Sequence, residues 1–213
     1  MINFLYLLFK GVKMSNNNLI NHHFDLSELL MSNIEDEYTF KQLLFNGADL
    51  NYQTPRGWCV LFEAVTSNYN DNIQEYIEAG ANLNIRDSKG RNALFWAIYS
   101  NNIEAVEILV SLGIDLLVKN ETNLYVMHFA VYNNNLELLK VLVDNGVDIN
   151  QKDDVQATAL IYAVIHNKIN LVDYLLDNGA NKFYEDDLGN SAMTLAYNLK
   201  VESMIEKLKG KIC

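Results

Sequence analysis

Residues 80–112, GANLNIRDSKGRNALFWAIYSNNIEAVEILVSL, contain in order every element that much of the chain repeats. The glycine that opens this stretch belongs to a series with a period of 33 residues. The 213-residue sequence holds five members of that series: Gly47, Gly80, Gly113, Gly146 and Gly179. A fixed period of this length predicts a repeat architecture, in which similar units stack side by side and each contacts only its neighbours.

The residue types within this stretch predict a turn, a short helix, a loop and a longer helix. Residues 80–90 are rich in Gly, Asn and Asp, which favour tight turns. Residues 93–98 are almost wholly apolar, whereas in residues 103–110 the apolar side chains recur at the steps of an amphipathic helix. Gly113 is expected to end that helix in a left-handed conformation. We expect the short helices of neighbouring units to approach closely at a column of small residues: Ala64, Ala97, Ala130, Ala163 and Ala196.

The two ends of the chain depart from this pattern. Residues 25–46 contain two helical stretches without the turn glycines, and the last unit ends in a lysine-rich helix at 205–209. Atypical terminal units are expected in a stack because they cover its exposed faces. We therefore divide the chain into a leader at 1–23, an N-terminal capping unit with the first turn at 24–55, four repeats at 56–88, 89–121, 122–154 and 155–187, and a C-terminal capping unit at 188–213.

A unit with Gly-Ala-Asn-Leu-Asn and then Asp and Gly in its turn, alanine in its first helix and a leucine-rich second helix resembles the ankyrin repeat. The resemblance covers residues 24–213. It implies an all-α ankyrin-repeat solenoid of stacked helix-turn-helix units with short β-turn or hairpin connections. The family's Thr-Pro-Leu-His tetrapeptide is degraded here, since its Thr survives only as Thr158 and its His only as His128. By its place in that motif, His128 is expected to be a hydrogen-bonded core residue.

The composition narrows the range of functions. The net charge of −11 argues against a nucleic-acid surface, which needs a basic stripe. Two isolated cysteines form no disulfide framework and favour a reducing, cytoplasmic location of the source cell or of a host, with Cys59 in the core. The apolar run at residues 2–9 is far too short to cross a bilayer, so we expect no membrane partner. Residues 1–13 could also precede the true start of the protein at Met14.

Motifs that carry chemistry are absent from the sequence. No phosphate loop, glycine-rich nucleotide turn, nucleophile elbow or metal-ligand spacing occurs. His22 and His23 with Asp25 suggest a metal site only weakly, because consecutive residues do not share a helix face and no further ligand lies near in sequence. We therefore expect a non-enzymatic protein without cofactor or metal.

The resemblance also directs attention to one surface. Ankyrin-like stacks bind partners with their turn tips and with the exposed faces of their first helices, which together line a concave groove. In this sequence those positions hold aromatic residues and arginine, the types that anchor interfaces. They are Arg56, Trp58, Lys89, Arg91, Tyr99, Leu124, Tyr132, Val155, Ile165 and His166. The alternative interpretation is that the aromatic side chains simply cover neighbouring repeats.

These observations favour a protein–protein interaction module with an unknown protein partner, monomeric by itself. The abundance of asparagine resembles the composition encoded by AT-rich genomes of intracellular bacteria and large DNA viruses, which suggests an effector that acts on host proteins. An inhibitor or immunity partner of another protein is an alternative. So is a structural protein whose end repeats stack on other copies. An enzyme is the least favoured alternative, because no segment outside the repeats could hold a second fold.

Overall fold

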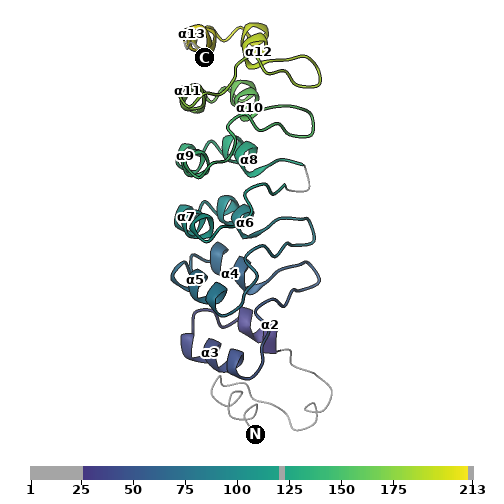
Figure 1. Ribbon diagram of the computed structural model, residues 1–213, viewed down its shortest axis with the longest axis vertical. Coiled ribbons are helices and arrows are strands. Elements are labelled where there is room, and N and C mark those ends of the chain that lie inside the picture. The colour runs from purple at the N-terminus through teal and green to yellow at the C-terminus, as the bar shows by residue number, and fades with distance from the viewer. Residues whose placement is uncertain (1–25, 120–122, 211–213) are drawn as a thin grey trace.

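The computed structural model describes residues 26–119 and 123–210, and these residues form an elongated stack of helix pairs (Figure 1). The first helices of the pairs make one column, the second helices make another, and hairpin loops project from the side of the first column (Figure 1). The described residues contain twelve helices, in chain order α2 (Leu26–Met31), α3 (Glu37–Phe45), α4 (Val60–Thr66), α5 (Asp71–Glu78), α6 (Ala93–Tyr99), α7 (Ile103–Ser111), α8 (Val126–Tyr132), α9 (Leu136–Asp144), α10 (Ala159–Ile165), α11 (Ile169–Asp177), α12 (Ala192–Leu199) and α13 (Glu202–Gly210). The predicted all-α repeat stack is confirmed.

The first helices are short and apolar because they are packed on several sides. Helix α10, with the sequence ALIYAVI, lies between α8 and α12 and also packs against α11 of its own unit. A seven-residue helix would not be stable alone, so tertiary packing must hold it in place. The predicted alanine column is completely buried in the five first helices α4, α6, α8, α10 and α12. A larger side chain there would force neighbouring units apart.

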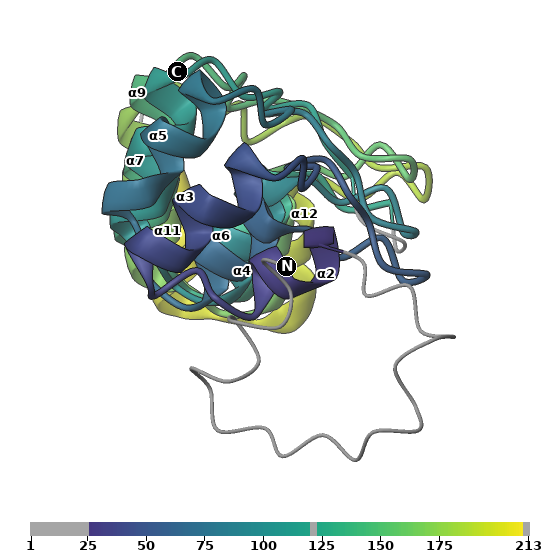
Figure 2. The ribbon, with the colours of Figure 1, turned by 90° about the horizontal axis from the view of Figure 1, so that it is seen from below.

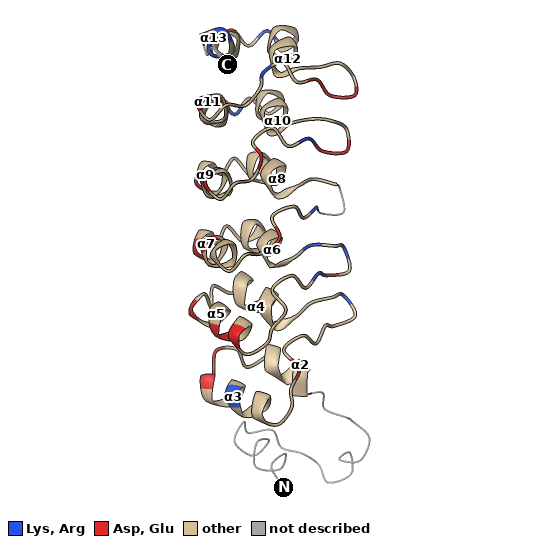
Figure 3. Cartoon of the chain, in the orientation of Figure 1, with Lys and Arg blue, Asp and Glu red and all other residues tan. Residues whose placement is uncertain are grey.

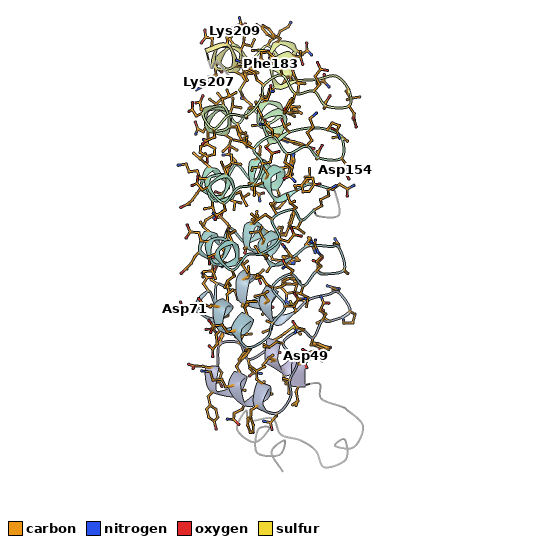
Figure 4. The ribbon with its side chains drawn as sticks, viewed as in Figure 1. Asp49, Asp71, Asp154, Phe183, Lys207 and Lys209 are labelled. Atoms are coloured by element: carbon orange, nitrogen blue, oxygen red, sulfur yellow. The ribbon has the colours of Figure 1, made fainter. Side chains whose placement is uncertain are left out.

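The second helices are amphipathic, and three of them, α3, α7 and α9, begin at side-chain caps. Asp36 caps α3 by accepting a hydrogen bond from the amide of Thr39. Asn102 and Asn135 cap α7 and α9 in the same way. Each cap satisfies one of the amides left without a partner at a helix start. The apolar side of each second helix is buried against the first helices. Asp71 and Lys207 lie on the side of the stack that the second helices form, away from the hairpin loops (Figure 4).

A second periodic column explains part of the asparagine content. The second residue after each of the helices α4, α6, α8 and α10 has a left-handed backbone, with φ of 61° at Asn68, 57° at Asn101, 55° at Asn134 and 53° at Asn167. Asparagine is one of the few residues with a side chain that adopts this conformation readily. These asparagines therefore serve the turn between the two helices of a unit, independently of any bias in genome composition.

The hairpin loops all project in the same direction, so that the molecule seen along the stack has an angled profile (Figure 2). Isolated antiparallel bridges close three of them: Lys119 with Tyr125, Lys152 with Thr158, and Glu185 with Ser191. Each loop thus leaves one unit and returns directly to the first helix of the next unit. The predicted hairpin connections are therefore present without extended strands in the described part of the chain.

Candidate functional site

Three bulky side chains point to solvent from the same position of three successive first helices. Tyr99 in α6 is 69% exposed, Tyr132 in α8 is 59% exposed and Ile165 in α10 is 47% exposed. They follow one another at the 33-residue period, so stacking of the units brings them into line. We call these three residues the inner row. Apolar side chains with this much exposure, in a regular line, can contact a partner without any rearrangement of the core.

A layer of larger aromatic side chains supports the inner row from one helical turn earlier. The ring of Trp96 lies 5.8 Å from that of Tyr99, and the ring of Phe129 lies 6.4 Å from that of Tyr132. Tyr162 occupies the same position in α10, and its hydroxyl donates a hydrogen bond of 2.7 Å to Asp153. Burial and the bond to Asp153 both raise the pKa of Tyr162. Its hydroxyl is therefore a neutral structural group at neutral pH.

Trp58 and Arg91, predicted to contact a partner, make extensive contacts within the chain. The indole of Trp58 packs edge-on against Trp96 at 4.6 Å and donates a hydrogen bond of 2.8 Å to Glu63. The guanidinium of Arg91 lies 4.2 Å from the centre of the Trp96 ring and bonds the buried carboxylate of Asp87 at 2.7 Å. Trp58 therefore packs on the next repeat and Arg91 on Trp96, so both side chains also contribute to packing within the chain. Both side chains remain half-buried and thus partly accessible.

The hairpin tips carry a different set of predicted residues. Arg56, Lys89 and Val155 occupy equivalent positions on three loops and are all exposed, whereas Leu124 is half-buried. In Figure 3 the first two loops carry basic residues and the last one carries acidic residues. Asp154, at the tip of the fourth loop, forms an ion pair with Lys119 of the third (Figure 4). The tips therefore change along the stack from basic to acidic.

The two histidines of the described repeats have different surroundings. His166 is exposed at the end of α10, and its ring lies 5.8 Å from the ring of Tyr132, beside the inner row. His128 is fully buried, as predicted, and its Nε2 lies 3.1 Å from the carbonyl oxygen of Ala157. Burial lowers the pKa of His128. His128 is therefore a neutral core residue that ties α8 to the next hairpin loop.

A pocket that the sequence analysis did not predict lies near the N-terminal end of the stack, on the side of the first helices that carries the inner row. Its volume is about 280 Å³, and its walls come from the loop between α2 and α3 and from the end of α4. The lining residues are Met31, Ser32, Asn33, Ile34, Glu35, Asp36, Glu63, Ser67 and Tyr69. We call this the end pocket. Glu63 holds the position in α4 that Trp96, Phe129 and Tyr162 hold in later units, so the 33-residue alignment could have singled it out as an acidic exception.

The one cysteine among the described residues, Cys59, is buried. Burial raises the pKa of the Cys59 thiol to about 11, which leaves it protonated and unreactive at neutral pH. Within residues 26–119 and 123–210, no three His, Cys, Asp or Glu side chains gather so as to hold a metal ion. The weakly suggested group of His22, His23 and Asp25 lies outside the described residues. Over the same part of the chain, no helix has the length and apolarity needed to cross a membrane.

Comparison with known proteins agrees with this architecture. A family model described as ankyrin repeats (3 copies) matches residues 26–120 and 122–210, so the chain belongs to the ankyrin repeat family. The fold is similar to the crystal structure of EF0377, an ankyrin repeat protein, with a TM-score of 0.77 and 22% sequence identity. That match covers 90% of this chain and 100% of the other. A comparison with curated proteins finds no match. Ankyrin repeats are in general non-enzymatic modules for protein–protein interaction.

Proposed function

We propose that this protein is a non-enzymatic interaction module that binds a protein partner along the inner row and the hairpin tips. The observation that carries the proposal is the alignment of Tyr99, Tyr132 and Ile165, exposed on three consecutive first helices. Tyrosine is a frequent anchor of interfaces because it presents a large, stiff, amphipathic surface. The supporting layer of Trp96 and Phe129 holds the two tyrosine rings in place before a partner arrives, which reduces the entropy cost of binding.

The test uses a triple variant of the inner row, Tyr99→Ser, Tyr132→Ser and Ile165→Ser. Its matched control changes three exposed residues that share one position of the second helices: Gln74→Ala, Glu107→Ala and Lys140→Ala. Proteins captured from the source cell are quantified for wild type and both variants. We expect the inner-row variant to lose the specifically captured protein and the control to retain it. Thermal unfolding of both variants should stay within a few degrees of wild type, because all six side chains are exposed.

Equal capture by wild type and the inner-row variant would refute the proposal. A large fall in the unfolding temperature of the inner-row variant would instead assign these side chains to stability. Inhibition or immunity would be a consequence of the same contact, and the identity of the captured protein would reveal it. The compartment in which that complex forms would test the expected location in the cytoplasm of the source cell or of a host.

Self-assembly is a second candidate function because α3, the second helix of the N-terminal capping unit, exposes two aromatic side chains. Tyr38 and Phe45 are seven residues apart and therefore lie on the same side of the helix, where both are largely exposed. This side of α3 could stack on another copy. Size-exclusion chromatography separates the candidates: a monomer supports the interaction module, whereas concentration-dependent oligomers that disappear in a Phe45→Ser variant support assembly.

A further inference from the structure

The end pocket lies where the inner row stops. In α4 the position of Tyr99 and Tyr132 is taken by Thr66, and Ser67, the next residue, lines the pocket. The replacement of a bulky ring by small polar side chains leaves room at this end of the inner face. A chain of contacts joins the two features, since Glu63 in the pocket bonds Trp58, Trp58 packs on Trp96, and Trp96 packs on Tyr99. The end pocket and the inner row are therefore linked by direct side-chain contacts.

The charge of the end pocket is negative. One oxygen of Glu63 accepts the indole N–H of Trp58 at 2.8 Å and the other accepts the hydroxyl of Ser67 at 3.1 Å. Glu35 accepts the hydroxyl of Tyr69. All of these donors are neutral, and among the described residues that line the pocket none is a lysine, arginine or histidine. The hydrogen bonds hold the carboxylates of Glu35 and Glu63 in place, and the lining residues within 26–119 supply no compensating positive charge.

We infer that the inner row binds a partner segment with a lysine or arginine side chain in the end pocket and apolar side chains on Tyr99, Tyr132 and Ile165. This inference rests on the proposed function and adds to it the chemistry of the partner. A carboxylate pair at one end of an apolar line is complementary to a segment that is basic at one end and apolar beyond it. Complementary charges also orient such a segment on the stack, because the reverse direction would leave the carboxylates opposite apolar side chains.

The stacking of the units predicts the spacing within that segment. Packed helices lie about 10 Å apart. An extended chain advances about 3.3 Å per residue, so neighbouring units are about three residues apart along a bound peptide. A basic residue in the end pocket therefore places apolar residues about three and about six positions further along, on Tyr99 and Tyr132. The net charge of −11 favours the approach of such a basic segment over long range.

The test starts from a phage-displayed library of random dodecamer peptides selected on the full-length protein. We expect the enriched peptides to share a lysine or arginine about three residues from an apolar residue. One enriched peptide is then synthesised with a fluorescent label, together with a copy in which norleucine replaces the basic residue. Fluorescence polarisation measures both peptides against wild type, Glu63→Gln, Glu35→Gln, the inner-row triple variant and the control Glu107→Gln, which lies on a second helix.

The substitution Glu63→Gln removes the charge but keeps an oxygen for the indole of Trp58. We expect this substitution to lower the affinity for the basic peptide by about tenfold or more and to leave the affinity for the norleucine peptide unchanged. Glu35→Gln, on the other wall of the end pocket, should lower the affinity for the basic peptide in the same way. The control Glu107→Gln should change the affinity for neither peptide. Enriched peptides that need the inner row but carry no basic residue would overturn this inference and leave the proposed function standing. A selection in which no peptide loses binding to the inner-row variant would overturn both.

Discussion

The side-chain oxygen of Asn84 accepts a hydrogen bond of 2.8 Å from the backbone amide of Asp115, which lies one repeat further along the chain. Equivalent bonds run from the amide of Asn82 to Asn51 and from the amide of Asn181 to Asn150. Each bond joins the base of one hairpin loop to the base of the next. The series is interrupted at Leu117, which occupies the same position and offers no oxygen to the amide of Asp148.

Leu117→Asn should restore the missing bond and stabilise the stack. Leu117 is 61% exposed, so its removal sacrifices little buried area. One additional hydrogen bond of this kind contributes about 1 kcal/mol to the free energy of unfolding. Urea unfolding followed by circular dichroism measures the change, and the reverse substitution Asn84→Leu should destabilise by a similar amount. A Leu117→Asn variant less stable than wild type would show that Leu117 has a packing role of its own.

Gly57 and Gly90 form a matched pair at the hairpin tips. Both have a left-handed backbone, with φ of 77° and 79°. Asn123 and Gln156 adopt such a backbone at the equivalent positions of later loops, so asparagine can take the place of glycine there. A Cβ at Gly57 would lie 2.5 Å from the backbone nitrogen of Ser88, whereas at Gly90 its nearest neighbour would be 3.9 Å away.

Gly57→Asn should therefore destabilise the protein much more than Gly90→Asn. We expect a cost of about 1–3 kcal/mol for Gly57→Asn, because the first two loops would have to separate. Gly90→Asn should stay within about 1 kcal/mol of wild type. Chemical denaturation of the two variants gives the comparison. Equal losses of stability would mean that the close contact between the two loops is dispensable.

A comparison of Asn102 with Asn135 distinguishes the stability contributed by a helix cap from that contributed by a buried hydrogen-bond network. Both cap a second helix. Asn102 is almost fully buried. Its side-chain amide also donates a hydrogen bond of 2.9 Å to the carbonyl oxygen of Val65 and one of 2.7 Å to the side-chain oxygen of Asn70 in the preceding unit. Asn135→Ala should cost about 1 kcal/mol, the usual value of a cap. Asn102→Ala should cost about 2–4 kcal/mol because it also leaves buried polar groups unpaired. A double-mutant cycle with Asn70 would measure the coupling directly.

His128 should make the stability depend on pH. Its pKa is lowered by burial, so the unfolded chain binds a proton at this residue more readily than the folded chain. The contribution of His128 is therefore fully present above about pH 6.5 and is progressively lost as the pH falls below that value. We expect the unfolding free energy to decline between pH 7.5 and pH 5, and His128→Leu to make this decline shallower. Equal slopes for wild type and His128→Leu would contradict this assignment.

The inner face shows which parts of the site could be anticipated. The repeat period puts Tyr99, Tyr132 and Ile165 at one position of successive first helices, because a strict period maps sequence position onto spatial rows, and all three are exposed. The alignment could not reveal that Trp58 is held by Trp96, since that contact depends on ring orientations across two units. The end pocket was missed because its walls include an irregular capping loop outside the repeat pattern.

The repeat pattern of the sequence is sufficient to specify the fold of this protein. Its glycine, asparagine and alanine columns fix where turns occur, where helices begin and where units approach, and these are local or nearest-neighbour requirements that a period displays openly. Which side chains remain available to a partner depends on the packing of the units in three dimensions. Exposure depends on how each unit is seated on the next, and so Arg91 is partly neutralised by Asp87 while Tyr132 stays open to solvent. The same seating gathers Glu35 and Glu63 from separate units into one pocket.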